Sequence, residues 1–326
     1  MHIARYRDRR TAQVSVGLVR DGRRTALTGC ASLSQLLAMP LDEIKARCSN
    51  AVDGAAATGR ADDVGTLDDT DAVDLLAPID GLTEVWASGV TYLWSREARA
   101  AESAGFASAY QQVYDAARPE LFFKSLAWRV SGPGASISVR ADSTVDVPEP
   151  ELALVVNAHR EVVGYCVCND VSSRSIEGEN PLYLPQAKVY LGSCALGPMI
   201  RPAWEIADPY QLAISARIVR DGETVWHGDA NTSQLNRRFD DLLEYLFRAD
   251  DFPAGVVLST GTCLVPALPF SLEVGDVVRI EIDAVGVLIN TVVRGKAAMR
   301  PLVGATSVDG ALRLPAGDAE PDDPVT

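Results

Sequence analysis

The stretch VPEPELALVV, residues 147–156, is followed by the turn sequence NAHRE at 157–161 and then by VVGYCVCND at 162–170. The two flanking runs are rich in aliphatic and β-branched residues, which favour extended backbone, whereas the segment between them is polar. This pattern predicts an antiparallel hairpin with strands at 151–156 and 162–168.

Acidic side chains gather where this hairpin opens. Residues i and i+2 of a strand face the same side, so Glu149 and Glu151 project together, about 6.6 Å apart along the chain. If the hairpin turns symmetrically, Glu149 lies opposite Asp170 on the same face of the sheet. Three carboxylates this close repel one another unless a cation neutralises them or they take up protons. Three hard oxygen ligands suit Mg²⁺, or Mn²⁺ in its place.

Two alternatives to a metal site remain open at this point. A β-bulge or a three-residue loop would place Asp170 on the other face of the sheet. The acidic pair also fits an exposed strand edge, which Pro148 and Pro150 permit because proline is tolerated at sheet edges. The pattern of residues does not by itself separate a metal site from an acidic edge.

Composition and charge narrow the class of protein. The chain has 326 residues, of which 47% are hydrophobic, enough to bury a substantial core. Its 30 Lys and Arg against 44 Asp and Glu give a formal net charge of −14, which argues against binding to nucleic-acid phosphates. No run of 18 apolar residues and no secretory signal is found, so no membrane span is expected. The six cysteines form no CxxC motif, so we expect packed, reduced thiols and a cytoplasmic location.

The pattern along the chain indicates three parts. We expect a small α+β domain at residues 1–80, a larger catalytic domain at 81–310 and an acidic tail at 311–326. Residues 50–80 contain eight Asp and one basic residue, which indicates a solvated connector or a surface excursion at the end of the first part. The elements expected in the first domain are a strand at 12–19 and a helix at 32–48.

The larger domain is expected to be mainly β, so the fold class is α+β. Hydrophobic alternation predicts short strands and hairpins, and apolar residues at helical spacing predict two helices. Besides the hairpin above, the expected strands are 83–89, 121–124, 137–140, 211–220, 224–226, 276–282 and 285–293. The expected helices are 95–114 and 234–247.

Other groups able to do chemistry lie outside the hairpin. Glu120 precedes an apolar strand and Lys124 follows it. Lys188 follows a loop at 177–187 whose length is typical of a functional loop, although a plain surface connection is commoner. Gly261 and Thr262 offer backbone N–H groups and a hydroxyl to an anion, or form an ordinary turn. Only three histidines occur, and no GxGxxG or P-loop is present. Neither a histidine-activated nucleophile nor a nucleotide site is therefore indicated.

Four motifs follow one another between residues 82 and 300. They read EPELALVV, GYCVCNDVSSRSIEGENPLYLPQAKVYLGSCALGPMI, STGTCLVP and LEVGDVVRIEIDAVGVLIN. Together they resemble the fumarylacetoacetate hydrolase superfamily. The resemblance implies that Glu149, Glu151 and Asp170 bind Mg²⁺ or Mn²⁺. It also implies a mixed β-sandwich or roll, usually dimeric, with a smaller N-terminal α+β domain.

Four further phrases narrow the resemblance. They read WASGVTYLWSREAR, RPELFFKS, RADSTVDVPEPELAL and IEGENPLYLPQAKVY. They are most similar to the 2-keto-3-deoxy sugar-acid dehydratases, which convert 2-keto-3-deoxy-pentonates into 2,5-dioxopentanoate. The resemblance implies that Glu120 and Lys188 are catalytic and that Arg96 and Thr262 bind substrate. The implied reaction passes through a metal-bound enolate, with the roles of base and acid unassigned between Glu120 and Lys188.

Two departures from relatives bear on this function. Hydrolytic members carry a water-activating histidine in the segment that matches residues 90–99, where this chain has none, so hydrolysis is disfavoured. Many relatives have Asp where Leu191 stands, a difference that bears on how Lys188 or the substrate is positioned.

An acylpyruvate hydrolase, a 2-oxo-acid decarboxylase and an enol–keto isomerase of the same superfamily remain alternatives, as does a catalytically silent homologue. The expected partner is a small 2-oxo acid, with no nucleic acid and no membrane, bound by a homodimer or larger homo-oligomer.

Overall fold

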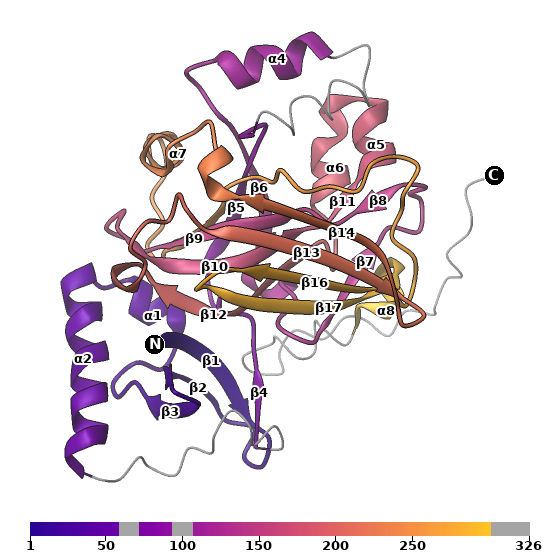
Figure 1. Ribbon diagram of the computed structural model, residues 1–326. Coiled ribbons are helices and arrows are strands. Elements are labelled where there is room, and N and C mark those ends of the chain that lie inside the picture. The colour runs from indigo at the N-terminus through magenta and orange to yellow at the C-terminus, as the bar shows by residue number, and fades with distance from the viewer. Residues whose placement is uncertain (59–71, 93–106, 301–326) are drawn as a thin grey trace.

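Two packed sheets dominate the computed structural model of the protein, which describes residues 1–58, 72–92 and 107–300 (Figure 1). The larger sheet has ten strands, and β4 (Val73–Leu75) pairs with β1 at its side. The other nine strands are, in spatial order, β3 (Arg23–Ala26), β2 (Val14–Arg20), β1 (His2–Asp8), β12 (Cys194–Pro202), β10 (Val162–Asp170), β9 (Pro150–Val156), β15 (Val256–Ser259), β5 (Glu84–Gly89) and β6 (Glu120–Leu126).

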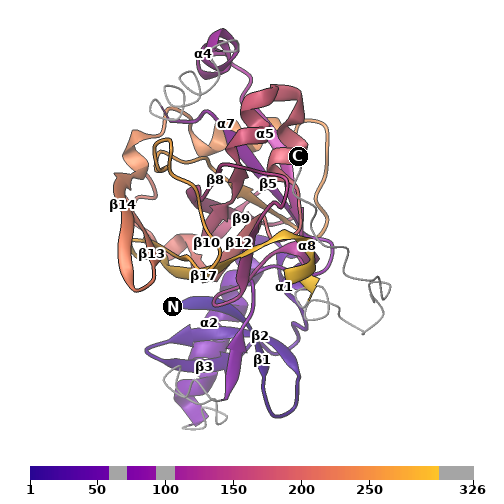
Figure 2. The ribbon, with the colours of Figure 1, turned by 90° about the vertical axis from the view of Figure 1, so that its right-hand side faces the viewer.

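The smaller sheet lies against the middle of the larger one (Figures 1 and 2). Its five strands are, in spatial order, β14 (Glu223–Asn231), β13 (Ala213–Arg220), β16 (Val277–Ile282), β17 (Gly286–Arg294) and β7 (Ser136–Val139). A two-stranded ribbon joins β8 (Asp146–Val147) to β11 (Ser172–Ser173). The mixed sheets confirm the expected fold class, α+β and mainly β.

Short helices surround the sheets. The α-helices are α1 (Leu33–Leu37), α2 (Leu41–Thr58), α4 (Ala107–Asp115), α5 (Arg174–Glu179), α6 (Leu184–Lys188), α7 (Phe239–Leu246) and α8 (Gly295–Ala298). The 3₁₀-helices are η1 (Ala127–Arg129), η2 (Pro181–Tyr183), η3 (Ala203–Glu205) and η4 (Thr232–Gln234). Within the described ranges, none of the helices combines the length and the apolar character that crossing a bilayer requires.

The central hairpin β9–β10 is buried on both faces. Leu152, Leu154 and Val156 point into a hydrophobic cluster shared with the smaller sheet. Ala153 and Val155, one residue out of phase, point into a second cluster shared with β1, β2 and α1. The N-terminal part of the chain therefore covers one face of the hairpin and the smaller sheet covers the other.

The register of this hairpin confirms the expected pairing. The N–H of Asp170 donates to the carbonyl of Glu149 at 3.0 Å, so the two residues lie opposite each other. The turn is not symmetric, however, because the register shifts between Val162 and Gly164. This irregularity lies beside the turn, and the pairing beyond it is regular up to the open end. The alternative in which a bulge moves Asp170 to the opposite face is therefore not realised.

The prediction of a single helix at 32–48 is wrong, because the structure has two helices there. α1 ends at Leu37, and α2 begins at Leu41, directly after Pro40. Proline disfavours helical backbone in the residue before it, so the chain turns at Met39. α2 then continues past the expected end, to Thr58.

The interpretation of residues 50–80 as a solvated connector or surface excursion is wrong at both ends, and its middle, residues 59–71, lies outside the described residues. α2 occupies its start, and β4 near its end pairs with β1. Asp80 is buried, and its carboxylate accepts hydrogen bonds from the backbone N–H groups of Leu33 (2.9 Å) and Ser34 (2.8 Å). A helix start leaves such N–H groups without helical partners and favours negative charge, so this acidic residue is structural.

The helix expected at 234–247 begins later than predicted, at Phe239. The residues before it are held by other parts of the chain, because the N–H of Asn236 donates to the carbonyl of Thr91 at 2.9 Å. A backbone group engaged in this way is not available to a helical ladder.

Two expectations fall partly or wholly outside the described residues. These are the tail at 311–326 and the first part of the helix at 95–114, whose described end is α4. The other predicted strands occur, with ends that differ by a few residues. All six cysteines are buried and unpaired, which confirms the expectation of packed, reduced thiols.

Candidate active site

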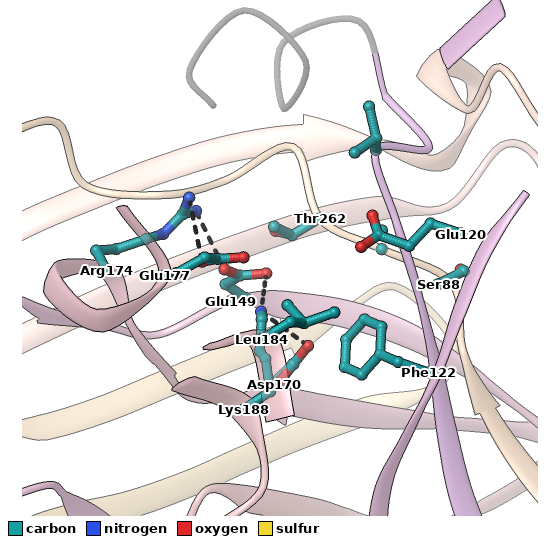
Figure 3. Close-up of a pocket in the computed structure, with 13 residues that line it drawn as sticks. Ser88, Glu120, Phe122, Glu149, Asp170, Arg174, Glu177, Leu184, Lys188 and Thr262 are labelled. Carbon is teal, nitrogen blue, oxygen red and sulfur yellow. Dashed lines mark hydrogen bonds and ion pairs between the residues drawn. The ribbon is translucent and has the colours of Figure 1, made fainter. Parts of the chain in front are cut away.

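A polar pocket lies where β9 begins and β10 ends, beneath α5 and α6 and beside β5 and β6 (Figure 3). The strands supply its floor and one wall, and the two short helices supply the opposite wall. The polar side chains that line it belong to Ser88, Glu120, Glu149, Asp170, Arg174, Glu177, Lys188 and Thr262.

Three carboxylates converge beside this pocket. Glu149, Glu151 and Asp170 are each at most 3% exposed, and one oxygen from each lies within 4.8 Å of the others. Glu149 and Glu151 continue the side of β9 that carries Ala153 and Val155, so they share the face predicted from the sequence. The expected gathering of the three side chains is confirmed, and the exposed acidic edge is excluded.

The electrostatics of the cluster favour a cation. Burial, together with the negative charges of Asp170 and Glu149, raises the pKa of Glu151 well above its usual value. A cation bound beside Glu151 would act in the opposite direction, because it favours the charged carboxylate. Three buried carboxylates with hard oxygen donors fit Mg²⁺ or Mn²⁺ on this ground.

Lys188 reaches into the cluster from the end of α6. Its Nζ lies 3.0 Å from an oxygen of Glu149 and 3.1 Å from Oδ2 of Asp170, and it donates to the hydroxyl of Ser172 at 2.5 Å. The three contacts match the three N–H donors of an ammonium group. The structure thus brings this sequence-predicted residue into contact with two of the predicted metal ligands.

A second lysine, Lys124 on β6, lies behind the cluster and is 1% exposed. Its Nζ lies 2.5 Å from Oδ1 of Asp170 and donates to the carbonyls of Val171 (3.1 Å) and Lys188 (2.5 Å). Lys124 therefore ties one acidic residue of the cluster to the main chain that carries Lys188. Lys124 is one of the candidate groups named from the sequence, where it follows an apolar strand, but no role was predicted for it.

Arg174 and Glu177 form the wall opposite Glu120 (Figure 3). Arg174 Nη2 lies 3.1 Å from Oε1 of Glu149, and its Nη1 lies 4.0 Å from Oε2 of Glu177. Both residues come from α5, where a spacing of three places them on one face. This pair was not predicted from the sequence, because residues 177–187 were expected to form a loop and the short helix that carries Arg174 and Glu177 was not expected.

Glu120 lies at the start of β6, directly opposite Gly89 of β5. A Cβ atom at position 89 would collide with the carboxylate of Glu120, so the space that this side chain occupies exists only because Gly89 has none. Glu120 is therefore brought to the pocket, as the sequence resemblance implies.

Thr262 also lines the pocket, but its hydroxyl already has protein partners. It donates to the carbonyl of Pro150 at 2.9 Å and accepts from the N–H of Leu264 at 3.1 Å. Arg96, the other residue expected to bind substrate, lies outside the described residues. The substrate-binding roles of Thr262 and Arg96 stay predictions.

Comparison of the chain with known proteins identifies the family to which it belongs. The family model described as fumarylacetoacetate (FAA) hydrolase C-terminal matches residues 84–293, a span that includes every residue of the carboxylate cluster. The chain therefore belongs to the fumarylacetoacetate hydrolase family, as the sequence resemblance predicted.

Relatives and solved structures narrow the similarity. The chain is 48% identical over 232 residues to a probable 2-keto-3-deoxyxylonate dehydratase of Haloferax volcanii, covering 69% of this chain and 79% of that protein. It is 43% identical over 223 residues to a 2-dehydro-3-deoxy-D-arabinonate dehydratase of Saccharolobus solfataricus, covering 68% and 74%. A solved structure of 2-keto-3-deoxy-D-arabinonate dehydratase complexed with magnesium and 2,5-dioxopentanoate superposes with a TM-score of 0.74 and 32% identity, covering 91% of this chain and 100% of that one.

Proposed function

We propose that the protein dehydrates a 2-keto-3-deoxy-pentonate to 2,5-dioxopentanoate with the help of a divalent cation. The observation that carries the proposal is a buried tri-carboxylate cluster beside a pocket that is lined by two of its members, Glu149 and Asp170, and also by Lys188 and Glu120. The chain's similarity to two dehydratases of this substrate class supports it.

The cation would be held by Glu149, Glu151 and Asp170. When bound, it would act as a Lewis acid that makes the C3 protons of a 2-oxo acid easier to remove. The pocket supplies cationic groups that offset the negative charge of the cluster, because Arg174 and Lys188 both contact Glu149. We propose Mg²⁺ as the native ion, with Mn²⁺ as a substitute.

Glu120 and Lys188 would carry the protons. The elimination step removes one proton from C3 and the hydroxyl from C4, which leaves as water. A proton then moves from C5 to C3, and the resulting enol gains a proton at C4 as its C5 hydroxyl loses one, which leaves an aldehyde at C5 and a net loss of one water. One group must accept a proton and another must donate one to the leaving hydroxyl, and each such positioned group supplies about 10²–10⁴-fold in rate. Two proton carriers on separate elements facing one pocket meet this need.

Substrate binding and domain roles complete the proposal. The hydroxyl of Thr262 is already engaged, so we propose that its backbone N–H and that of the neighbouring turn contact the substrate carboxylate, with Arg96 as a second contact. We further propose residues 81–310 as the catalytic domain, because every described site residue lies there. Residues 1–80 would cover the hairpin face opposite the smaller sheet. We propose a homodimer or larger homo-oligomer and a cytoplasmic location.

The test is a product assay. Purified protein is incubated with 2-keto-3-deoxy-arabinonate and with 2-keto-3-deoxy-xylonate, each with Mg²⁺, with Mn²⁺ and with EDTA. We expect aldehyde formation that depends on the added metal and is lost in EDTA. Glu120→Gln should lower turnover by about 10²–10⁴-fold, whereas Glu244→Gln, which alters an exposed carboxylate on α7, should not change it.

Other products would replace the proposal with a related reaction. Release of CO₂ would indicate a decarboxylase, a cleaved acid would indicate a hydrolase, and enol–keto exchange without loss of water would indicate an isomerase. Metal binding with no turnover of any 2-oxo acid would indicate a catalytically silent homologue.

A further inference from the structure

The two carboxylate oxygens of Glu151 have different surroundings. Oε2 accepts a hydrogen bond from the hydroxyl of Ser259 at 2.5 Å and another from the backbone N–H of Gly261 at 2.8 Å. Among the described residues, the hydrogen bonds of the Glu151 carboxylate are both made by Oε2 and neither by Oε1. This differs from Glu149 and Asp170, both of which contact Lys188.

The segment that supplies these two donors, residues 259–262, is itself fixed to its neighbours. The hydroxyl of Ser88 donates to the carbonyl of Ser259 at 3.0 Å, and that of Thr91 donates to the carbonyl of Thr260 at 2.7 Å. The N–H of Thr260 donates to the carbonyl of Leu152 at 3.0 Å. The donors are therefore held in place before any ligand arrives.

Backbone geometry at Gly261 explains why this turn carries glycine. Its φ of +90° lies in the region that L side chains rarely adopt, and a Cβ there would collide with the hydroxyl of Thr91. This conformation is the one in which its N–H meets Oε2 of Glu151. Ser259, in contrast, is the only side-chain donor among the described residues that contacts Glu151.

We propose that Ser259 is a positioning residue for the metal site. By holding Oε2 of Glu151, together with the N–H of Gly261, it fixes the orientation of that carboxylate and leaves Oε1 as the oxygen offered to a divalent cation. The inference rests on the metal site of the proposed function and adds to it a residue that does not touch the metal or the substrate. Partners of this kind typically change metal affinity by about 10–100-fold.

The alternative is that the hydroxyl of Ser259 has only a structural role, as one more buried hydrogen bond at the end of a strand. Ser138 on β7 provides a matched control for that role. Like Ser259 it is almost fully buried, and its hydroxyl donates to backbone carbonyls, those of Val139 and Gly295, rather than to a site carboxylate. Loss of either hydroxyl removes a buried hydrogen bond, but only one of them bonds Glu151.

The experiment measures binding of Mn²⁺ alone to the full chain. Free Mn²⁺ is followed by electron paramagnetic resonance for the wild type, Ser259→Ala, Ser259→Thr and Ser138→Ala, and thermal unfolding of each is recorded in EDTA. We expect Ser259→Ala to weaken Mn²⁺ binding by about 10–100-fold and to alter the spectrum of the bound ion. Ser138→Ala should bind as the wild type does, and Ser259→Thr, which keeps the hydroxyl, should recover most of the affinity.

The outcomes separate this inference from the proposed function. If the wild type fails to bind Mn²⁺, the metal site itself is refuted. If the wild type binds and Ser259→Ala binds within about 3-fold of it, the metal site stands and the role of Ser259 is refuted. An equal loss in Ser259→Ala and Ser138→Ala also refutes it. The comparison of the two alanine variants decides the question even if the bulkier threonine variant does not fold.

Discussion

The two faces of strand β9 have the same backbone but different tasks. One face carries Leu152, Leu154 and Val156, all fully buried against the smaller sheet. The other face is apolar at Ala153 and Val155 and becomes acidic toward the start of the strand, at Glu151. Because a strand alternates sides, stability and chemistry can be assigned to alternate residues of a single segment.

This contrast shows what the N-terminal part of the chain contributes. The acidic end of the face lies beside the pocket, which Glu149 lines, while the apolar end is covered by β1, β2 and α1. Without that cover, the hydrophobic cluster beneath the site would be exposed. The N-terminal residues therefore complete the packing of the sheet face on which the carboxylates stand.

Removing a charge from the acidic face should have the largest effect. Asp170→Asn keeps the size of the side chain but removes the charge that contacts Lys124 and Lys188. We expect divalent metal binding to weaken by more than about 100-fold, beyond the usual effect of an outer partner, and turnover to be lost. Isothermal titration with Mn²⁺ measures the first and the aldehyde assay the second. Wild-type metal content by elemental analysis would contradict the assignment.

Lys188→Met tests chemistry separately from metal binding. We expect turnover to fall by about 10²–10⁴-fold because a proton carrier is lost. Metal should still bind, since the three carboxylates remain and a competing cation is gone. Lys45→Met, which changes a lysine of α2, serves as the control and should leave both quantities unchanged. Unchanged turnover in Lys188→Met would remove that residue from the mechanism.

A substitution on the apolar face of β9 should lower stability and leave metal affinity unchanged. Leu154→Ala leaves a cavity between the sheets, where the side chain is 0% exposed, and we expect it to lower the free energy of unfolding by about 2–5 kcal/mol. The affinity of the remaining folded protein for Mn²⁺ should be unchanged. Urea unfolding and metal titration of the same preparation check both parts. A loss of affinity comparable to that of Asp170→Asn would show that the two faces are not independent.

Sequence reasoning located the hairpin and its acidic end because both depend on local alternation. Glu149 and Asp170 are far apart in the chain but become neighbours through one turn, so a simple hairpin register predicted their pairing, although a bulge that would separate them remained open until the structure was known. Lys124 and Ser259 could not be placed in the same way. Their contacts with Asp170 and Glu151 depend on the order of strands in the sheet, which no local pattern encodes.

Helix ends and the acidic segment were less predictable for a different reason. In the sequence, Asp80 is one of the eight Asp residues of the segment 50–80 and is indistinguishable from an exposed one. Tertiary packing nevertheless buries it at the start of α1. The break at Pro40 was present in the sequence but was outweighed by the regular leucine spacing around it. Composition describes an average environment, whereas such positions are decided by single long-range contacts.

A buried carboxylate outside the cluster gives the smallest predicted effect and a test of the electrostatic argument. Asp146 on β8 is 1% exposed, and burial raises its pKa to about 6, although Ser143 and two nearby arginines act in the opposite direction. An exposed aspartate has a pKa near 4. The folded protein therefore holds the proton more tightly than the unfolded chain, and stability from this group falls as pH rises between these values.

Asp146→Asn should raise the free energy of unfolding by up to about 3 kcal/mol at pH 8 and by almost nothing near pH 3.5. Urea unfolding at several pH values measures this. A variant whose advantage is the same at both ends of the range would show that burial is not what perturbs this carboxylate.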